Sequence, residues 1–157
     1  MKKVLIALDY DPTAQKIAEL GFTFAKLMNA EITLLHVVSD ATHYSFLEYS
    51  PIMGFNGFTD ANIEFETIDM LEKAAHDFLN KAKQHLGDEA IKIEVRNGDF
   101  ANSIISAAKD LHADVIVLGT HSRRGLDKIL MGSVAEKVLH QSTIPLFIIP
   151  TKDVSKK

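Results

Sequence analysis

A strand–helix–strand pattern runs through residues 4–38, which read VLIALDYDPTAQKIAELGFTFAKLMNAEITLLHVV. The stretch opens and closes with short apolar runs, Val4 to Leu8 and Ile32 to Val38. Between them apolar residues recur at helical spacing, and Asp11-Pro12 marks the start of a helix that we expect over residues 12–28. Two short buried strands joined by such a helix are typical of a parallel sheet.

The rest of the chain repeats this alternation. Further apolar runs occupy residues 91–95, 115–118 and 146–149, and they alternate with amphipathic stretches at about 68–86, 101–111 and 131–139. The second of the four helical stretches should stop at Gly87. We therefore expect an α/β fold in which helices cover both faces of a five-stranded parallel sheet. A chain of 157 residues suits a single domain, which we place over residues 1–157.

Composition and charge exclude several classes of protein. The chain has no cysteine, which rules out disulfides and thiolate metal sites and fits a cytoplasmic location. Its net charge of −4 gives no general attraction for nucleic acid, so we expect no nucleic-acid partner. The opening apolar run is too short for a membrane span, and we expect no membrane association. None of the seven histidines has metal-ligand spacing, and we expect His36 to be a hydrogen-bonded core residue.

Two of the expected strands differ from the others. In the run 91–95 apolar and polar residues alternate strictly, which predicts an edge strand with one wet face. The run 146–149 is apolar throughout, and its own helices could bury both of its faces. If it lies at the other edge of the sheet, however, its unpaired apolar edge could pair with other chains and cause aggregation. We therefore expect a second copy of the chain to cover it.

The segment from Ser39 to Ala61 has no periodicity and carries five aromatic residues with two glycines. Long segments of this kind within a domain are either functional or disordered. We expect a mobile flap over the ligand crevice, and disorder is the alternative.

Ligands of open parallel sheets bind outside the carboxyl ends of the strands, which here are Asp9, Val38, Gly98 and Gly119. After Gly119 the chain continues Thr-His-Ser-Arg-Arg-Gly and then reaches Gly132-Ser133 at the start of the last helix. Glycines, a hydroxyl and a helix N-terminus together can hold a phosphate. The same residues could serve only for turning and capping, and spacing alone leaves both interpretations open.

The positions of Gly119, Ser122 and Gly132-Ser133 resemble the G-x2-G-x9-G-[S/T] loop of universal stress proteins of the ATP-binding kind. The likeness extends over nearly the whole chain. It includes the phrases Ala7-Leu8-Asp9, Leu35-His36-Val37-Val38, Val117-Leu118-Gly119-Thr120-His121, Gly132-Ser133-Val134-Ala135-Glu136 and Ile144-Pro145.

This resemblance implies a Rossmann-like sheet of order 3-2-1-4-5 and a homodimer joined through Leu146, Phe147, Ile148 and Ile149. It also implies an adenine nucleotide, ATP or else AMP or ADP, with or without Mg²⁺, between strands one and four. Asp9 and Ala7 would meet the adenine, Val37 the base or ribose, and the loop after strand four the phosphates. The cofactor-binding residues expected on this basis are Ala7, Asp9, Val37, Leu118, Gly119, Ser122, Arg123, Gly132, Ser133 and Val134.

Ser122 departs from the family pattern, which has glycine at this position. If the site requires a left-handed backbone, a non-glycine residue costs about 1–2 kcal/mol, which would weaken binding roughly 5- to 30-fold. Gly125 could take over the turn, and Arg123 or Arg124 could add charge-assisted contacts to phosphate.

The leading functional hypothesis is an adenine-nucleotide-binding stress-response or signalling protein. No general base accompanies the phosphate loop, so any ATP hydrolysis should be slow, and we expect no catalytic residue and no resident metal. One alternative is a Mg²⁺-dependent nucleotide hydrolase that uses Asp9 or Asp11. Another is a phosphoacceptor domain, although Arg96-Asn97 stand where it would need an aspartate. A third is a dimeric protein-interaction module in which Ser122 prevents nucleotide binding.

Overall fold

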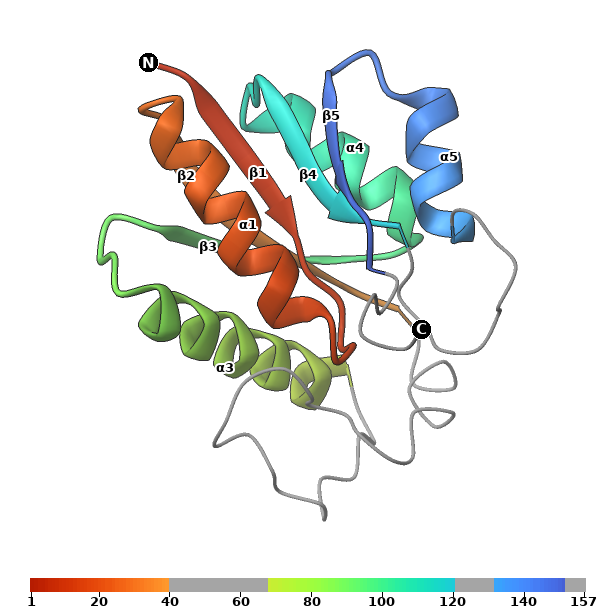
Figure 1. Cartoon of the computed structure of the whole chain (residues 1–157). Coiled ribbons are helices and arrows are strands. Elements are labelled where there is room, and N and C mark those ends of the chain that lie inside the picture. The colour runs from red at the N-terminus through yellow and green to blue at the C-terminus, as the bar shows by residue number, and fades with distance from the viewer. Residues whose placement is uncertain (40–67, 121–131, 152–157) are drawn as a thin grey trace, which may run out of the picture.

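The computed structural model describes residues 1–39, 68–120 and 132–151 of the chain (Figure 1). The strands are β1 (Lys3–Ala7), β2 (Glu31–Val38), β3 (Lys92–Asn97), β4 (Val115–Gly119) and β5 (Leu146–Ile149). The helices are α1 (Ala14–Leu27), α3 (Ile68–Leu86), α4 (Phe100–Asp110) and α5 (Ser133–Gln141). Residues 40–61 of the expected flap lie outside the described residues.

The five strands form one parallel sheet of order β3-β2-β1-β4-β5, which confirms the expected fold class and strand order. Helices α1 and α3 cover one face of the sheet, and α4 and α5 cover the other (Figure 1). Alternate residues of β1 point to opposite faces, so Val4 and Ile6 enter one core while Leu5 enters the other. As predicted, α3 ends before Gly87, whose φ of 71° is a conformation that glycine adopts without strain.

Helix α1 begins at Ala14, two residues later than the sequence predicts. The Asp11 carboxylate accepts hydrogen bonds from the Thr13 backbone N–H at 2.9 Å and from the Thr13 hydroxyl at 2.5 Å. These bonds close a local turn that competes with helix formation, so the helix starts after it. Further along, a Cβ on Gly21 would lie 3.0 Å from Ile6 Cδ1, which explains a glycine where the helix meets the sheet.

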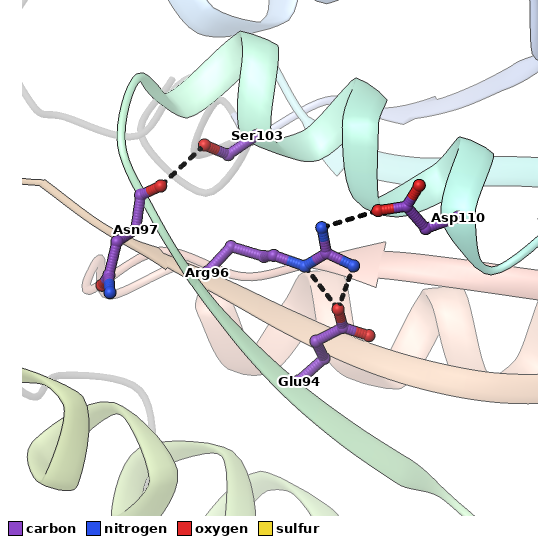
Figure 2. Close-up of polar contacts among 5 residues, drawn as sticks. All are labelled: Glu94, Arg96, Asn97, Ser103 and Asp110. Atoms are coloured by element: carbon purple, nitrogen blue, oxygen red, sulfur yellow. Dashed lines mark hydrogen bonds and ion pairs between the residues drawn. The ribbon is translucent and has the colours of Figure 1, made fainter.

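Strand β3 lies at one edge of the sheet and extends two residues beyond the predicted run. Ile93 and Val95 pack against the core on the α3 side, as the alternation predicted. The opposite face is less wet than expected, because Glu94 and Arg96 are only partly exposed. Arg96 is paired with Glu94 and with Asp110 at the end of α4 (Figure 2). Charged side chains on an edge strand also oppose pairing with another chain.

Strand β5 forms the other edge, and α1 and the α4–α5 layer cover its two faces. Phe147 stacks on Phe24 of α1 with ring centroids 4.2 Å apart, while Leu146 and Ile148 pack against the α4–α5 side. Ile149 is buried, whereas the other three residues are only partly buried. Within the described ranges no strand pairs with the outer edge of β5.

Two ion pairs predict how acid affects the stability of the fold. Glu19 of α1 lies 2.6 Å from His85 of α3, and Lys26 of α1 donates to Asp88 at 2.8 Å. The hydrogen bond with His85 lowers the pKa of Glu19, and the hydrogen bond from Lys26 lowers the pKa of Asp88. Because both pKa values are lower in the folded protein, the stability that these carboxylates contribute is present above their unfolded pKa of about 4. It is lost as the pH falls through the folded values.

We therefore expect the urea midpoint to fall between pH 5 and pH 3, and Asp88→Asn to reduce that fall. The effect should shrink at high salt, since these groups are near the surface. An acid response in Asp88→Asn identical to that of the unaltered protein would contradict the assignment.

In the described part of the chain, no helix is both long and apolar enough to cross a bilayer.

Candidate functional site

A cleft opens at the carboxyl ends of β1, β2 and β4, where the first turns of α1, α4 and α5 also converge. The space between its walls, open mouth included, is about 640 Å³. The cleft lies where strand order reverses between β1 and β4, which is the position expected for a ligand of an open α/β sheet.

One wall of the cleft is apolar. It is made by Leu35 and Val37 of β2, Leu118 of β4, and Phe100 and Ile104 of α4. All of these side chains belong to the core on the α4–α5 side or pack against it. The wall therefore has a fixed shape and offers a surface for a flat apolar group.

Two aspartates lie on the loop between β1 and α1. Asp9 is partly exposed, and its Oδ1 accepts a hydrogen bond from the Tyr10 backbone N–H at 2.8 Å. Asp11 is 7% exposed and is bonded to Thr13. Among residues 1–39, 68–120 and 132–151, no group of three or more His, Asp or Glu side chains is arranged to hold a metal ion. The alternative of a Mg²⁺-dependent hydrolase thus has only these two carboxylates to draw on in the described cleft.

The N-terminus of α5 differs from that of α4, where Asp99 caps the helix by accepting from the Asn102 N–H at 3.0 Å. The N-cap residue of α1, Thr13, also has no side-chain cap, but the Asp11 carboxylate lies just before that helix. The N-cap of α5 is Gly132, with no side-chain cap, and the first helical bond there runs from the Glu136 N–H to the Gly132 carbonyl. The N–H groups of the first turn point out of the helix end and favour an anion.

Gly132 itself is held by the strand end. Its N–H donates to the Thr120 carbonyl, so the two described residues on either side of positions 121–131 are hydrogen-bonded to each other. The Thr120 hydroxyl also accepts from the Thr151 N–H at 3.1 Å. The Gly132 N–H is consequently engaged in the structure, and Ser133, Val134 and Ala135 provide the N–H groups of the first helical turn.

Gly119 has a packing role that was not expected from the sequence. We expected it to let the backbone approach a phosphate. A Cβ at this position would lie 2.5 Å from Ile17 Cδ1 and 2.7 Å from Thr151 Cγ2. Packing against α1 and the chain after β5 therefore requires glycine here, with or without a ligand.

Seven of the predicted site residues line this cleft: Ala7, Asp9, Val37, Leu118, Gly119, Gly132 and Val134. Ser133 is exposed at the start of α5 and does not line the cleft, and Ser122 and Arg123 lie outside the described residues. Sequence reasoning missed Thr13, Phe100, Ile104 and Thr120. The strand end at Gly98 was a signal for Phe100, which follows it by two residues.

His36 is a buried core residue, as predicted, and is 1% exposed. Its Nδ1 lies 2.8 Å from the Leu8 carbonyl oxygen and must therefore carry the proton. The ring packs on Tyr10 and Phe78, with centroid distances of 4.3 and 5.7 Å. These contacts hold Leu8, which follows β1 and lines the cleft, against the core.

Comparison with known proteins gives a consistent result. The model of the universal stress protein family matches residues 1–150. Universal stress protein MJ0577 of Methanocaldococcus jannaschii is 28% identical over 156 residues, covering 97% of this chain and 96% of that protein. A solved structure of MJ0577 covers 97% of each chain with 27% identity and a TM-score of 0.72.

Two other solved structures contain nucleotides. One is a universal stress protein in complex with cAMP, with 19% identity, coverage of 96% of this chain and 98% of that chain, and a TM-score of 0.60. The other is the universal stress protein from Archaeoglobus fulgidus in complex with dAMP, with 16% identity, coverage of 95% and 98%, and a TM-score of 0.60. At these identities they are similar to this chain in fold. Sheet order, cleft position and the family match over residues 1–150 together lead to one conclusion: the chain belongs to the universal stress protein family.

Proposed function

We propose that the chain binds an adenine nucleotide in the cleft and acts as a stress-response or signalling protein with at most slow ATP hydrolysis. The observation that carries this proposal is the pairing of an apolar wall with a helix N-terminus that has no side-chain cap, both in one cleft. A nucleotide has the matching parts, a flat base and an anionic phosphate. The cAMP- and dAMP-bound relatives support an adenine nucleotide as the ligand class.

Electrostatics orients the ligand in this proposal. The phosphates lie at the start of α5, and the base lies against Val37 and the rest of the apolar wall. Asp9 then accepts a hydrogen bond from an amino group of the base, because a carboxylate would repel phosphate. Arg123 or Arg124 adds a charge-assisted contact to the phosphate oxygens, and Mg²⁺ accompanies the phosphates when ATP is the ligand. A cytoplasmic location is consistent with the lack of cysteine.

Calorimetric titration with AMP, ADP and ATP, with and without Mg²⁺, tests nucleotide binding. Gly132→Val should abolish measurable binding, because Gly132 lines the cleft and a branched side chain there would occupy the proposed phosphate position. Asp9→Ala should weaken the binding of adenine nucleotides. Its rate of phosphate release from ATP should remain as slow as that of the unaltered protein.

Ser122→Gly is the matched control for the phosphate loop, and we expect equal or tighter binding because glycine restores the family pattern. No binding of any of these nucleotides at millimolar concentration would favour the nucleotide-independent interaction module. Rapid phosphate release that Asp9→Ala abolishes would favour the hydrolase.

We also propose that β5 pairs with its counterpart in a second copy of the chain. The Ile149 carbonyl accepts from the Thr120 N–H, and the Pro145 carbonyl accepts from the Ile116 N–H. Because backbone groups alternate in direction along a strand, those of Ile148 point away from β4 and toward the outer edge. The apolar side chains of β5 add burial to such a pairing.

Ile148→Pro removes the outward N–H without removing a bond to β4, and we expect it to convert a dimer to a monomer in sedimentation experiments. Ile148→Val keeps the N–H and should remain dimeric. A strict monomer at micromolar concentration in the unaltered protein would refute the dimer.

A further inference from the structure

The turn between β3 and α4 is held by several independent contacts. Gly98 has a φ of 129°, which side-chain-bearing residues rarely adopt, and its N–H donates to the Val38 carbonyl at 2.9 Å. Asp99 caps α4 by accepting from the Asn102 N–H at 3.0 Å, and it is also paired with Lys137 of α5 at 3.1 Å. The turn is therefore tied to the neighbouring strand β2 and to both helices of this layer.

Arg96 of β3 adds contacts between this strand and α4 (Figure 2). Its guanidinium is paired with Glu94 on its own strand and donates to Asp110 Oδ2 at 2.9 Å. The Ser103 hydroxyl donates to the Asn97 carbonyl at 3.4 Å. Ser103 lies in the first turn of α4 and Asp110 is its last residue (Figure 2), so β3 contacts that helix near both of its ends. The first turn of α4 consequently has little freedom to move relative to the sheet.

This bracing fixes the position of Phe100, the first residue of α4. Phe100 is partly buried, packs against the core on the α4–α5 side, and lines the cleft. Ile104 lines the cleft one turn further along the same helix, and Val37 lines it from β2. Phe100 is the aromatic residue among those that line the cleft in the described part of the chain.

We infer that Phe100 is a base-recognition residue, whose ring packs on the face of the nucleotide base and makes binding depend on an aromatic base. This inference rests on the proposed function. The phosphate position at α5 uses different residues, so removing the ring should weaken recognition of the base and leave recognition of the sugar phosphate unchanged. An aromatic ring that is already held in place loses little freedom on binding.

The test compares AMP with ribose 5-phosphate, which lacks the base. Stacking contacts of this type predict that Phe100→Ala weakens AMP binding by roughly 5- to 150-fold. Phe100→Leu, which keeps an apolar side chain, should weaken AMP binding less than alanine does, and Phe100→Tyr should bind AMP nearly as well as the unaltered protein. In NMR titrations, ribose 5-phosphate should bind all of these proteins equally.

Two results would overturn the inference. One is AMP binding by Phe100→Leu and Phe100→Ala that equals that of the unaltered protein. The other is an equal loss for AMP and ribose 5-phosphate, which would show that Phe100 only supports the fold. Failure of the proposed function is distinct from both, because the unaltered protein would then bind neither AMP nor ATP and the inference would fall with it.

Phe100→Trp provides a second readout that a purely structural role would not change. The chain contains no tryptophan, so this substitution introduces a single fluorophore. Saturating AMP should quench its emission, whereas ribose 5-phosphate should not. Phe22→Trp is the matched control, since Phe22 lies on α1 and does not line the cleft. Emission of Phe100→Trp that stays unchanged while AMP binds would contradict contact between the ring and the base.

Discussion

Gly119→Ala is expected to lower the free energy of unfolding by about 1–3 kcal/mol, and Gly119→Val by more. The added Cβ would meet Ile17 Cδ1 at 2.5 Å and Thr151 Cγ2 at 2.7 Å, distances far below van der Waals contact. Neither neighbour can retreat easily, since Ile17 is 5% exposed in the core and Thr151 is tied to Thr120. Urea unfolding followed by circular dichroism measures the loss.

A double-mutant cycle isolates the cause of this loss. Ile17→Val removes the Cδ1 atom that causes the closest contact, so Gly119→Ala should cost less in the Ile17→Val background than alone. The coupling should reach about 1 kcal/mol, as is common for residues in contact. Additive effects of the two substitutions would contradict the clash with Ile17 Cδ1 as the main cause of the loss. Gly21→Ala is a useful comparison, because its closest contact is longer, at 3.0 Å.

His36→Ala is expected to lower the free energy of unfolding by roughly 2–5 kcal/mol, because it leaves a cavity and removes a buried hydrogen bond. His36 lies in β2, and its Nδ1–H donates to the Leu8 carbonyl at 2.8 Å, next to Asp9. The same substitution should therefore weaken nucleotide binding by loosening the end of β1. Urea unfolding and AMP titration on the same protein sample measure both effects.

His36→Phe separates the two contributions. Phenylalanine can fill the space between Tyr10 and Phe78 but cannot donate to Leu8, so it should cost only about 1–3 kcal/mol. If His36→Phe destabilised the protein as much as His36→Ala, the hydrogen bond rather than the packing would account for the whole effect. If His36→Ala cost less than about 1 kcal/mol, the described role of His36 in the core would be wrong.

The candidate site was only partly predictable. Asp9, Val37, Gly119 and Gly132 were identified through the family pattern, and the cleft contains all four. Phe100 and Thr120 were missed because neither is a ligand position of the family's nucleotide loop. Thr120 stands within the family phrase Val117 to His121, and Phe100 follows the strand end at Gly98, but neither signal assigns the residue to the site. Their importance appears only when β3, α4 and the end of β4 are placed around the same space.

The sequence by itself determined the order of helices and strands and the parallel sheet, because hydrophobic spacing and turn residues are properties of short segments. The end of α3 before Gly87 and the polar face of β3 were likewise predictable from short segments of sequence. Only the tertiary structure decided why Gly119 must be glycine, where the Gly132 N–H is bonded, and that Phe100 lines the cleft. The physical reason is that each of these depends on contacts between segments far apart in the chain, such as Gly119 with Ile17, which no local pattern encodes.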